Sequence, residues 1–219
     1  DLNELCAHSL YLAANDKRII AVDAINGRPC PEFGIEGVVD VLPYIQKMEP
    51  TNQIQAMQLK SPPAVVNGVV IIGGTGNKFK DASSVNGAVR AFDAVTGEFL
   101  WSFDTLIRDP DSDESLPYNV GGANVWTTMS VDSQRDLVFI PTASASPNFY
   151  GGLRPGDNRY ANSVLVLKAQ TGELVWHYQT IHHDIWDWDL PTHPLLVDVT
   201  TEDGKQPIVI ALGKTGMVY

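Results

Sequence analysis

The sequence predicts an all-β protein, and two observations support that prediction. Short runs rich in β-branched and aromatic residues alternate with clusters of Gly, Asn, Asp and Pro, which is typical of strands joined by turns. No segment keeps an amphipathic helical period over three or more turns. The clearest expected strands lie at 9–14, 18–24, 64–74, 88–94, 136–143, 162–169, 173–180 and 207–213.

A repeated unit of strand, turn and strand organises these runs. Each unit contains a tight turn whose glycine can adopt a positive φ at little cost. The turn glycines Gly27, Gly97 and Gly172 are 70 and 75 residues apart. Such repeats indicate a β-propeller, and a period above the roughly 40–50 residues of ordinary blades implies long loops. We therefore expect residues 1–219 to form a partial β-propeller domain of about three blades, because three repeats do not close a propeller.

A tryptophan follows the turn glycine by four residues in the second and third units, as Trp101 and Trp176. It falls on the return strand, where a ring of this size can bury against the next sheet. The first unit lacks this tryptophan, and the third has Lys168 where the second has Asp93.

The composition narrows the range of partners. Fifteen Lys and Arg against 26 Asp and Glu give a formal net charge of −11, which argues against a nucleic-acid backbone or an anionic membrane surface. The hydrophobic fraction of 44% is enough for a packed core. No apolar run approaches the roughly 18 residues of a membrane-spanning helix. Cys6 and Cys30 are compatible with one disulfide or with two free, buried thiols.

The stretch TIHHDIWDWDLP, residues 180–191, concentrates polar side chains that could carry chemistry. A zinc site at His182, His183 and Asp184 is disfavoured, because adjacent residues of a strand point to opposite faces. A carboxylate beside a divalent cation could instead take the proton of an alcohol. The plain structural alternative is that the aspartates cap turns and that backbone groups satisfy the histidines.

The segment AFDAVTGEFLW at 91–101 matches the motif A-x-D-x-x-T-G-x-x-x-W of quinoprotein dehydrogenases. Further segments resemble, in family order, the membrane-bound glucose dehydrogenase branch of these pyrroloquinoline quinone (PQQ)-dependent enzymes, so that essentially the whole chain is covered. The segments lie at 18–41, 61–74, 87–104, 150–199 and 213–216. The resemblance implies part of an eight-bladed propeller of four-stranded antiparallel sheets. It also implies PQQ near the axis, beside Ca²⁺ or Mg²⁺.

The resemblance assigns roles to particular residues. Asp187 occupies the position of the catalytic base, and Lys214, 27 residues later, that of the lysine contacting the quinone. An ammonium there would polarise a quinone carbonyl as hydride arrives. Trp126 would form a floor for the flat cofactor. His183 is a further candidate cofactor contact, although a supporting role is favoured for it, as for its neighbours Asp184 and Asp189.

The expected metal site departs from the pattern of the family. Asn77 follows Gly76 where relatives often carry an Asp-Asn pair near the cofactor or metal. Asn77 is therefore a candidate cofactor contact and, with Asp187, a candidate metal ligand, with Asp81 as a nearby alternative. Ser144 stands where many relatives have a ligating Asn, and a serine is a poorer ligand.

Two further departures concern the segment after Ser144 and the cysteines. The motif Thr-Pro-Asp-x-Trp-Gly-Gly of the relatives reads Ser-Pro-Asn-Phe-Tyr-Gly-Gly at 146–152, which places Asn148 at the Asp position. The adjacent-cysteine disulfide of methanol and ethanol dehydrogenases is absent. In the glucose branch, cysteines at positions like Cys6 and Cys30 bracket a hairpin, which favours a disulfide between them.

The leading functional hypothesis is a segment of a PQQ-dependent sugar, polyol or alcohol dehydrogenase, completed by the remaining propeller blades. Asp187 would take the hydroxyl proton, hydride would pass to the quinone, and electrons would continue to ubiquinone or a cytochrome. The resemblance implies a periplasmic location, or attachment to the inner membrane through a segment outside this chain. The competing hypothesis is a propeller binding or scaffold module that has lost PQQ chemistry.

Overall fold

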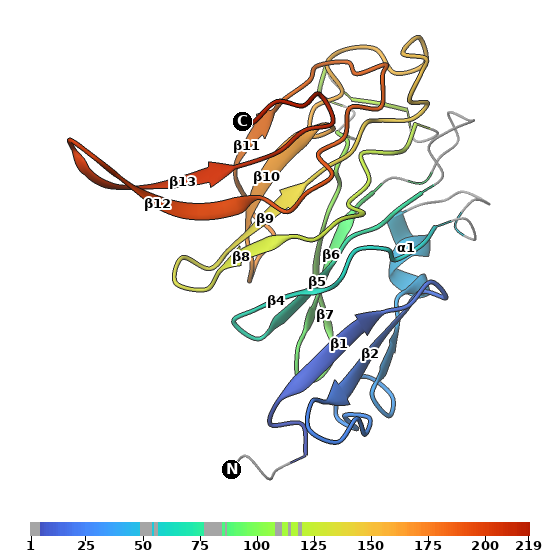
Figure 1. Cartoon of the computed structure of the whole chain (residues 1–219). Helices are drawn as coiled ribbons and strands as arrows, with labels where there is room; N and C mark the ends of the chain where they lie inside the picture. The colour runs from blue at the N-terminus through green and yellow to red at the C-terminus, as the bar shows by residue number, and fades with distance from the viewer. Residues whose placement is uncertain are drawn as a thin grey trace.

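The computed structural model describes residues 5–48, 54, 57–76, 85, 87–107, 111–113, 115–117 and 120–219. Within these residues the chain is almost entirely β, with strands in four antiparallel sheets that follow one another along the sequence (Figure 1). The first sheet contains β1 (Ser9–Ala13), β2 (Arg18–Asp23) and β3 (Val38–Asp40). The second contains β4 (Ala64–Val66), β5 (Val69–Ile72), β6 (Val89–Asp93) and β7 (Phe99–Phe103).

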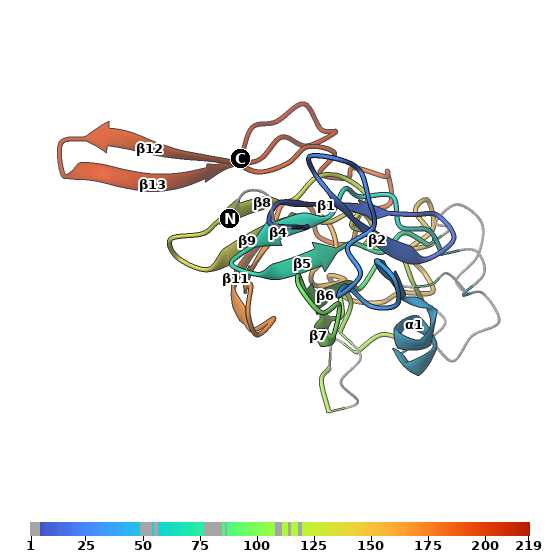
Figure 2. The same cartoon turned by 90° about the horizontal axis from the view of Figure 1, so that it is seen from below.

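The third sheet is again four-stranded, and the fourth is a two-stranded hairpin that projects from the body of the molecule (Figures 1 and 2). The third contains β8 (Ser130–Asp132), β9 (Leu137–Pro141), β10 (Ser163–Lys168) and β11 (Leu174–Gln179). The hairpin contains β12 (Leu195–Thr201) and β13 (Gly204–Ile210). Consecutive strands pair in each sheet, as the meander of a propeller blade requires.

The helix α1 (Leu42–Met48) interrupts the β structure, and the sequence pattern did not predict it. It is seven residues long, too short for a period over three turns to be visible. The side chain of Asp40 accepts the N–H of Leu42 at 2.9 Å and so caps its start. Ile45 is fully buried, and Tyr44 stacks on Phe99 with ring centroids 4.8 Å apart, which joins the helix to the core.

The hydrophobic core lies between consecutive sheets, because successive side chains of each central strand point to opposite faces. On β5, Val70 and Ile72 pack toward the first sheet, whereas Val69 and Ile71 pack toward the third. Because both faces are covered, β5 is buried at all four positions and appears in the sequence as one apolar run. On β10, two buried sets likewise face opposite sides. The set facing the second sheet is Leu165 and Leu167; the set facing the hairpin is Val164 and Val166.

Trp101 connects the second sheet to the third. Its indole Nε1 donates to the carbonyl of Ala169 at 2.8 Å, and only 7% of the residue is exposed. The ring lies on Gly172, where an added Cβ would stand 2.6 Å from two ring carbons. The tryptophan of one repeat therefore rests on the turn of the next, which confirms the expected burial against the following sheet.

Replacing Gly172 by Ala is expected to destabilise the protein more than replacing Gly27 by Ala. Both glycines have a φ of +71°, so both substitutions cost about 1–2 kcal/mol of backbone strain. Only at position 172 does the new methyl group collide with Trp101, which adds about 1–3 kcal/mol. Thermal unfolding of the two variants measures the difference, because no atom lies within 4 Å of the Cβ position at Gly27. Equal losses at both sites would contradict the docking described here.

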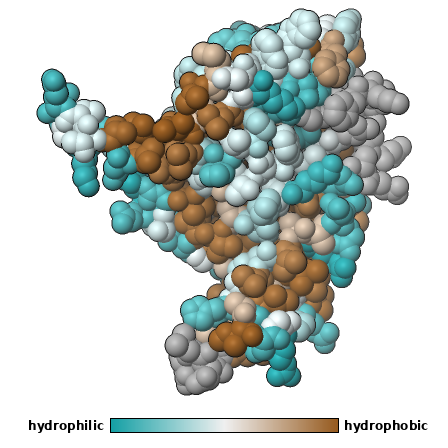
Figure 3. Space-filling model, viewed as in Figure 1, coloured by the Kyte–Doolittle hydropathy of each residue, from teal (hydrophilic) through white to brown (hydrophobic). Residues whose placement is uncertain are grey.

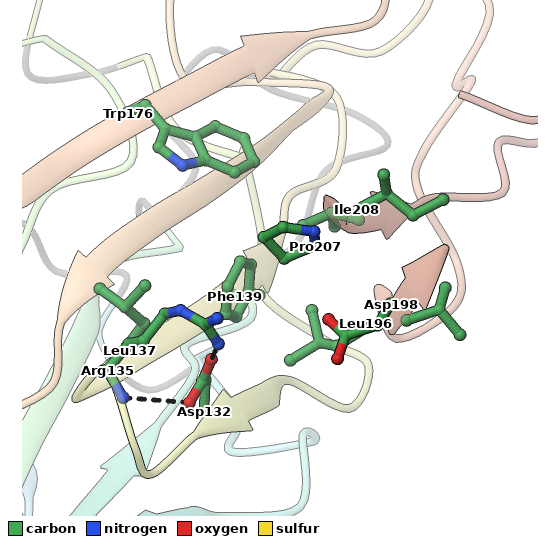
Figure 4. A pocket seen from close by; sticks show the side chains of 11 residues that line it. Asp132, Arg135, Leu137, Phe139, Trp176, Leu196, Asp198, Pro207 and Ile208 are labelled. Atoms are coloured by element: carbon green, nitrogen blue, oxygen red, sulfur yellow. Dashed lines mark hydrogen bonds and ion pairs between the residues drawn. The ribbon is translucent and has the colours of Figure 1, made fainter. Parts of the chain in front are cut away.

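Trp176 is the counterpart of Trp101 in the third sheet, yet it is 39% exposed. It borders an open cleft of about 370 Å³ between that sheet and the hairpin (Figure 4). Phe139 meets its ring edge-on at 6.3 Å, and the ion pair of Arg135 with Asp132 (2.6 Å) lies beside Phe139. Pro207 and Ile208 of β13 form the opposite side. Figure 3 shows an apolar surface along the part of the hairpin nearest the body.

A disulfide joins Cys6 to Cys30, 24 residues apart, which confirms the pairing that the resemblance favoured. It ties the segment before β1 to the loop after β2. The described part of the chain contains no helix that is long and apolar enough to cross a bilayer.

Candidate active site

The loops that follow β9, β11 and β13 gather above the sheets in Figure 1 and interlock through backbone hydrogen bonds. The N–H of Lys214, after β13, donates to the carbonyl of Asp189 at 3.0 Å. The N–H of Ala123, which precedes β8, donates to the carbonyl of Ser144, which follows β9, at 2.8 Å. Asn124 also holds Gly76 through both ends of its side-chain amide, at 2.9 and 3.1 Å. Segments far apart in sequence thus share one end of the sheets.

Asp184 organises the loop between β11 and β12. Its carboxylate is buried and accepts the backbone N–H groups of Trp186 at 2.9 Å and Trp188 at 2.8 Å. It also accepts the hydroxyl of Ser144 and, at 3.0 Å, the amide of Asn162. Four donors therefore hold this carboxylate inside the loop, an arrangement that agrees with the supporting role predicted for Asp184.

Asp187 stands at the apex of the turn that Asp184 closes. Its backbone φ is +61°, a left-handed conformation that aspartate tolerates better than most residues. Its side chain is 17% exposed and meets two donors. Nδ2 of Asn148 donates to Oδ1, and Nζ of Lys214 donates to Oδ2 at 2.8 Å. The structure thus brings together Asp187 and Lys214, the two residues given catalytic roles by the resemblance.

Lys214 lies between two carboxylates. Its Nζ is 2.8 Å from Oδ2 of Asp187 and 2.8 Å from Oδ2 of Asp189. Asp189 is fully buried, and its Oδ1 accepts the N–H of Ser144 at 2.9 Å. Partial burial of Lys214 disfavours its charge, but the hydrogen bonds to both carboxylates outweigh this and raise its pKa. The lysine is therefore held as an ammonium.

Arg154 joins the two loops that carry the site, and the sequence analysis did not identify it. Its guanidinium is fully buried and donates to the carbonyls of Pro147 (3.0 Å) and Asp184 and to Oδ1 of Asn158. Burial lowers the pKa of Arg154, and the negative charge of Asp184 opposes that shift. In the sequence it is one basic residue in a polar loop, which ordinarily indicates a solvated charge.

The remaining candidates lie around this centre. The ring of His183 turns toward the loop at 151–156, where Nδ1 is 2.7 Å from the carbonyl of Gly156. Gly151 makes room for it, since a Cβ there would stand 2.0 Å from Nε2. These contacts favour the supporting role for His183; its cofactor contact stays a prediction. Trp126 is partly exposed, next to Val125, whose N–H donates to Gly74 at 3.1 Å. Asn77 and Asp81 lie outside the described residues.

The donor set fits a hard cation better than zinc. Across the residues with described positions, no three His, Cys, Asp or Glu side chains are grouped as metal ligands. Ser146 Oγ and Asn148 Oδ1, however, are buried without a hydrogen-bond partner in that same part of the chain. Buried oxygens of this kind require an explanation, and neutral and carboxylate oxygens are the ligands of Ca²⁺ and Mg²⁺. The flat ring of Trp126 and the positive charge of Lys214 likewise suit a planar, anionic quinone.

The fold and these residues define a β-propeller of the quinoprotein class. The chain belongs to the PQQ family described as glucose/ethanol/alcohol dehydrogenase, beta-propeller domain, which matches residues 1–219. The predicted resemblance and fold class are therefore confirmed.

Individual relatives agree with this assignment. The chain is 37% identical over 218 residues to the quinoprotein glucose dehydrogenase of Escherichia coli (strain K12), covering 98% of this chain and 27% of that protein. It is 34% identical over 223 residues to the quinate/shikimate dehydrogenase (quinone) of Acinetobacter baylyi, covering 99% and 27%. Among solved structures, it resembles the quinohemoprotein alcohol dehydrogenase ADHIIG of Pseudomonas putida HK5, with a TM-score of 0.76 and 27% identity over 96% of this chain and 31% of that one. The chain thus spans about a quarter of the length of the curated relatives it matches.

Proposed function

We propose that this chain carries the proton-accepting and quinone-contacting residues of a PQQ-dependent dehydrogenase that oxidises a sugar or polyol hydroxyl group. One observation supports this most directly: the carboxylate of Asp187 and the ammonium of Lys214 are 2.8 Å apart at the exposed end of an interlocked loop cluster. Sugar and polyol substrates are proposed because the relatives named above include glucose and quinate/shikimate dehydrogenases.

Asp187 would act as the general base. Hydrogen bonds from Asn148 and Lys214 fix its carboxylate, and the carboxylate of Asp184 holds the turn that carries it. The base is therefore oriented before substrate arrives. Taking the hydroxyl proton neutralises its negative charge. The second carboxylate partner of Lys214, Asp189, then remains in place and keeps the ammonium positioned. Preorganised groups of this kind lower the barrier because little reorganisation is needed during reaction.

The cofactors would bind over this cluster. When bound, PQQ supplies the quinone that accepts hydride from the alcohol carbon, so that the alcohol becomes a carbonyl compound. Trp126 would lie against the plane of the ring system, and Lys214 would donate to a quinone oxygen. We assign Ca²⁺ or Mg²⁺ to oxygen ligands that include Asp187 and Asn77, where its charge would help to keep Asp187 ionised.

The partners and the location follow as proposals from the same family membership. Electrons would pass to ubiquinone or a cytochrome, and the protein would work in the periplasm or facing it. The sheets described here would contribute about three blades, with the remaining blades completing the walls of the substrate site.

Reconstitution tests this function. The intact apoprotein is mixed with PQQ and Ca²⁺ or Mg²⁺, and reduction of an artificial electron-acceptor dye is followed with glucose, glycerol, quinate and ethanol as substrates. We expect PQQ-dependent reduction with at least one sugar or polyol and a weaker response to ethanol. PQQ binding without reduction of dye by any of these substrates would contradict the proposal and favour a non-catalytic propeller module.

A further inference from the structure

We propose that Asn148 supplies a carboxamide oxygen ligand to the divalent cation beside Asp187, a role that the sequence pattern would place at position 144. The inference rests on the proposed function, since it concerns the cation of the same site. It starts from one feature: Asn148 is fully buried, and one half of its amide has no partner among the residues that the structure describes.

Ser144 is unavailable as a ligand because the loop network already uses it. The residue is fully buried, and its hydroxyl donates to Asp184 and lies 3.2 Å from Oδ1 of Asp189. The amide of Asn162 reaches the same hydroxyl at 3.2 Å. Turning Ser144 toward a cation would break contacts that shape the loop carrying Asp187.

Asn148 has the geometry that Ser144 lacks. Its Nδ2 donates to Oδ1 of Asp187, and this orientation is fixed because an amide oxygen facing a carboxylate oxygen would be repelled. Oδ1 is bonded to the same carbon as Nδ2, and the proposal places it and the Asp187 carboxylate on one cation. A buried carbonyl oxygen without a donor costs about 1–3 kcal/mol, and coordination of a cation removes that cost.

The backbone and the charges around Asn148 suit this role. Arg154 holds the carbonyl of Pro147, the residue before Asn148, so the ligand is positioned by a rigid support. The carboxylates of Asp184, Asp187 and Asp189 face two cationic side chains here, Arg154 and Lys214. One negative charge remains to attract a divalent cation, which would share Asp187 with Lys214.

Two substitutions separate a ligand from a residue that only holds Asp187. Ca²⁺ alone is titrated calorimetrically into the intact apoprotein without PQQ. Asn148→Leu removes both the donor and the oxygen, and we expect its Ca²⁺ affinity to fall by about 10–100-fold. Asn148→Asp loses the donor but keeps an oxygen, so its affinity should stay within about threefold of wild type or increase. Asn26→Asp, at an exposed turn, makes the same change of charge away from the site and should leave the affinity unchanged.

The outcomes decide the matter. Equal losses in the Leu and Asp variants would mean that Asn148 acts only through its hydrogen bond to Asp187, and the proposal would fail. It would fail also if the Leu variant kept wild-type affinity, or if wild-type protein bound no Ca²⁺. Circular dichroism checks folding, and Asn148→Ala replaces the Leu variant, with the same expectation, if the latter does not fold. Dye reduction by the wild-type protein is measured separately. If the enzyme is active but its Ca²⁺ affinity does not depend on Asn148, this inference alone is refuted. If the protein is inactive but its Ca²⁺ affinity does depend on Asn148, only the proposed dehydrogenase function is refuted.

Discussion

Replacing Asp187 by Asn is expected to lower substrate turnover by about 10²–10⁴-fold, the usual contribution of a general base. A carboxamide has nearly the same shape as the carboxylate and can still accept from Lys214, but it cannot take up a proton at neutral pH. The turn itself should survive, because the donors from Trp186, Trp188 and Asn162 bind Asp184 instead.

The measurement is the turnover number of the PQQ-loaded protein, together with PQQ binding followed by absorbance. We expect binding to change little while turnover collapses. Asp203→Asn, at the exposed tip of the hairpin, makes the same chemical change far from the loops and should keep full activity. If Asp187→Asn retained turnover within about threefold of wild type, Asp187 would not be the base.

Replacing Lys214 by Met should lower turnover by about 10²–10³-fold, a loss comparable to removing one oxyanion donor. Methionine preserves much of the length of the side chain but cannot stabilise negative charge on a quinone oxygen. The variant also leaves the buried carboxylate of Asp189 without its cationic partner, so a lower melting temperature should accompany the lost turnover. Unchanged turnover in a folded Met variant would remove Lys214 from the mechanism.

The pH dependence of this stability difference follows from the raised pKa of Lys214. Its ordinary pKa is 10.5; partial burial lowers the pKa, but hydrogen bonds to two carboxylates outweigh burial and raise the pKa in the folded protein. A raised lysine pKa contributes stability that is fully present below the unfolded value and is lost as the pH rises through the folded value. The melting temperatures of wild type and Lys214→Met should therefore differ by a constant amount between about pH 7 and 9, and should converge above about pH 10.5. A difference that grew at alkaline pH would contradict this reading.

The strands with the strongest local pattern in the sequence are central strands covered on both faces. β5 and β10 are central strands covered on both faces, and each appears as an unbroken apolar run. β3 and β8 were missed because each has three residues, too few to show a pattern, and the run expected as one strand at 64–74 is a hairpin of the three-residue β4 with β5. β12 was missed because Leu195–Thr201 carries polar residues and is mostly exposed on the projecting hairpin. Local pattern thus predicted the central strands of the sheets and, at the periphery, β1, β11 and β13, but not β12.

The candidate site divides in a similar way. Asp187 and Lys214 could be identified because the resemblance to quinoprotein dehydrogenases includes their separation of 27 residues. Arg154 and Asn148 could not be assigned roles, because their importance depends on contacts across 30 and 39 positions of the chain. A buried arginine and a half-satisfied amide become informative only when the loops from different sheets are seen together.

The division between Asp184 and Asp187 affects how mutations in this loop should be interpreted. Asp184 has no reactive role in the proposed function, yet its carboxylate accepts four hydrogen bonds. An activity screen alone would score both positions as essential and could take either one for the base. The two variants should differ only in assays of structure. Protease sensitivity or amide hydrogen exchange should show a loosened loop for Asp184→Asn and a native loop for Asp187→Asn.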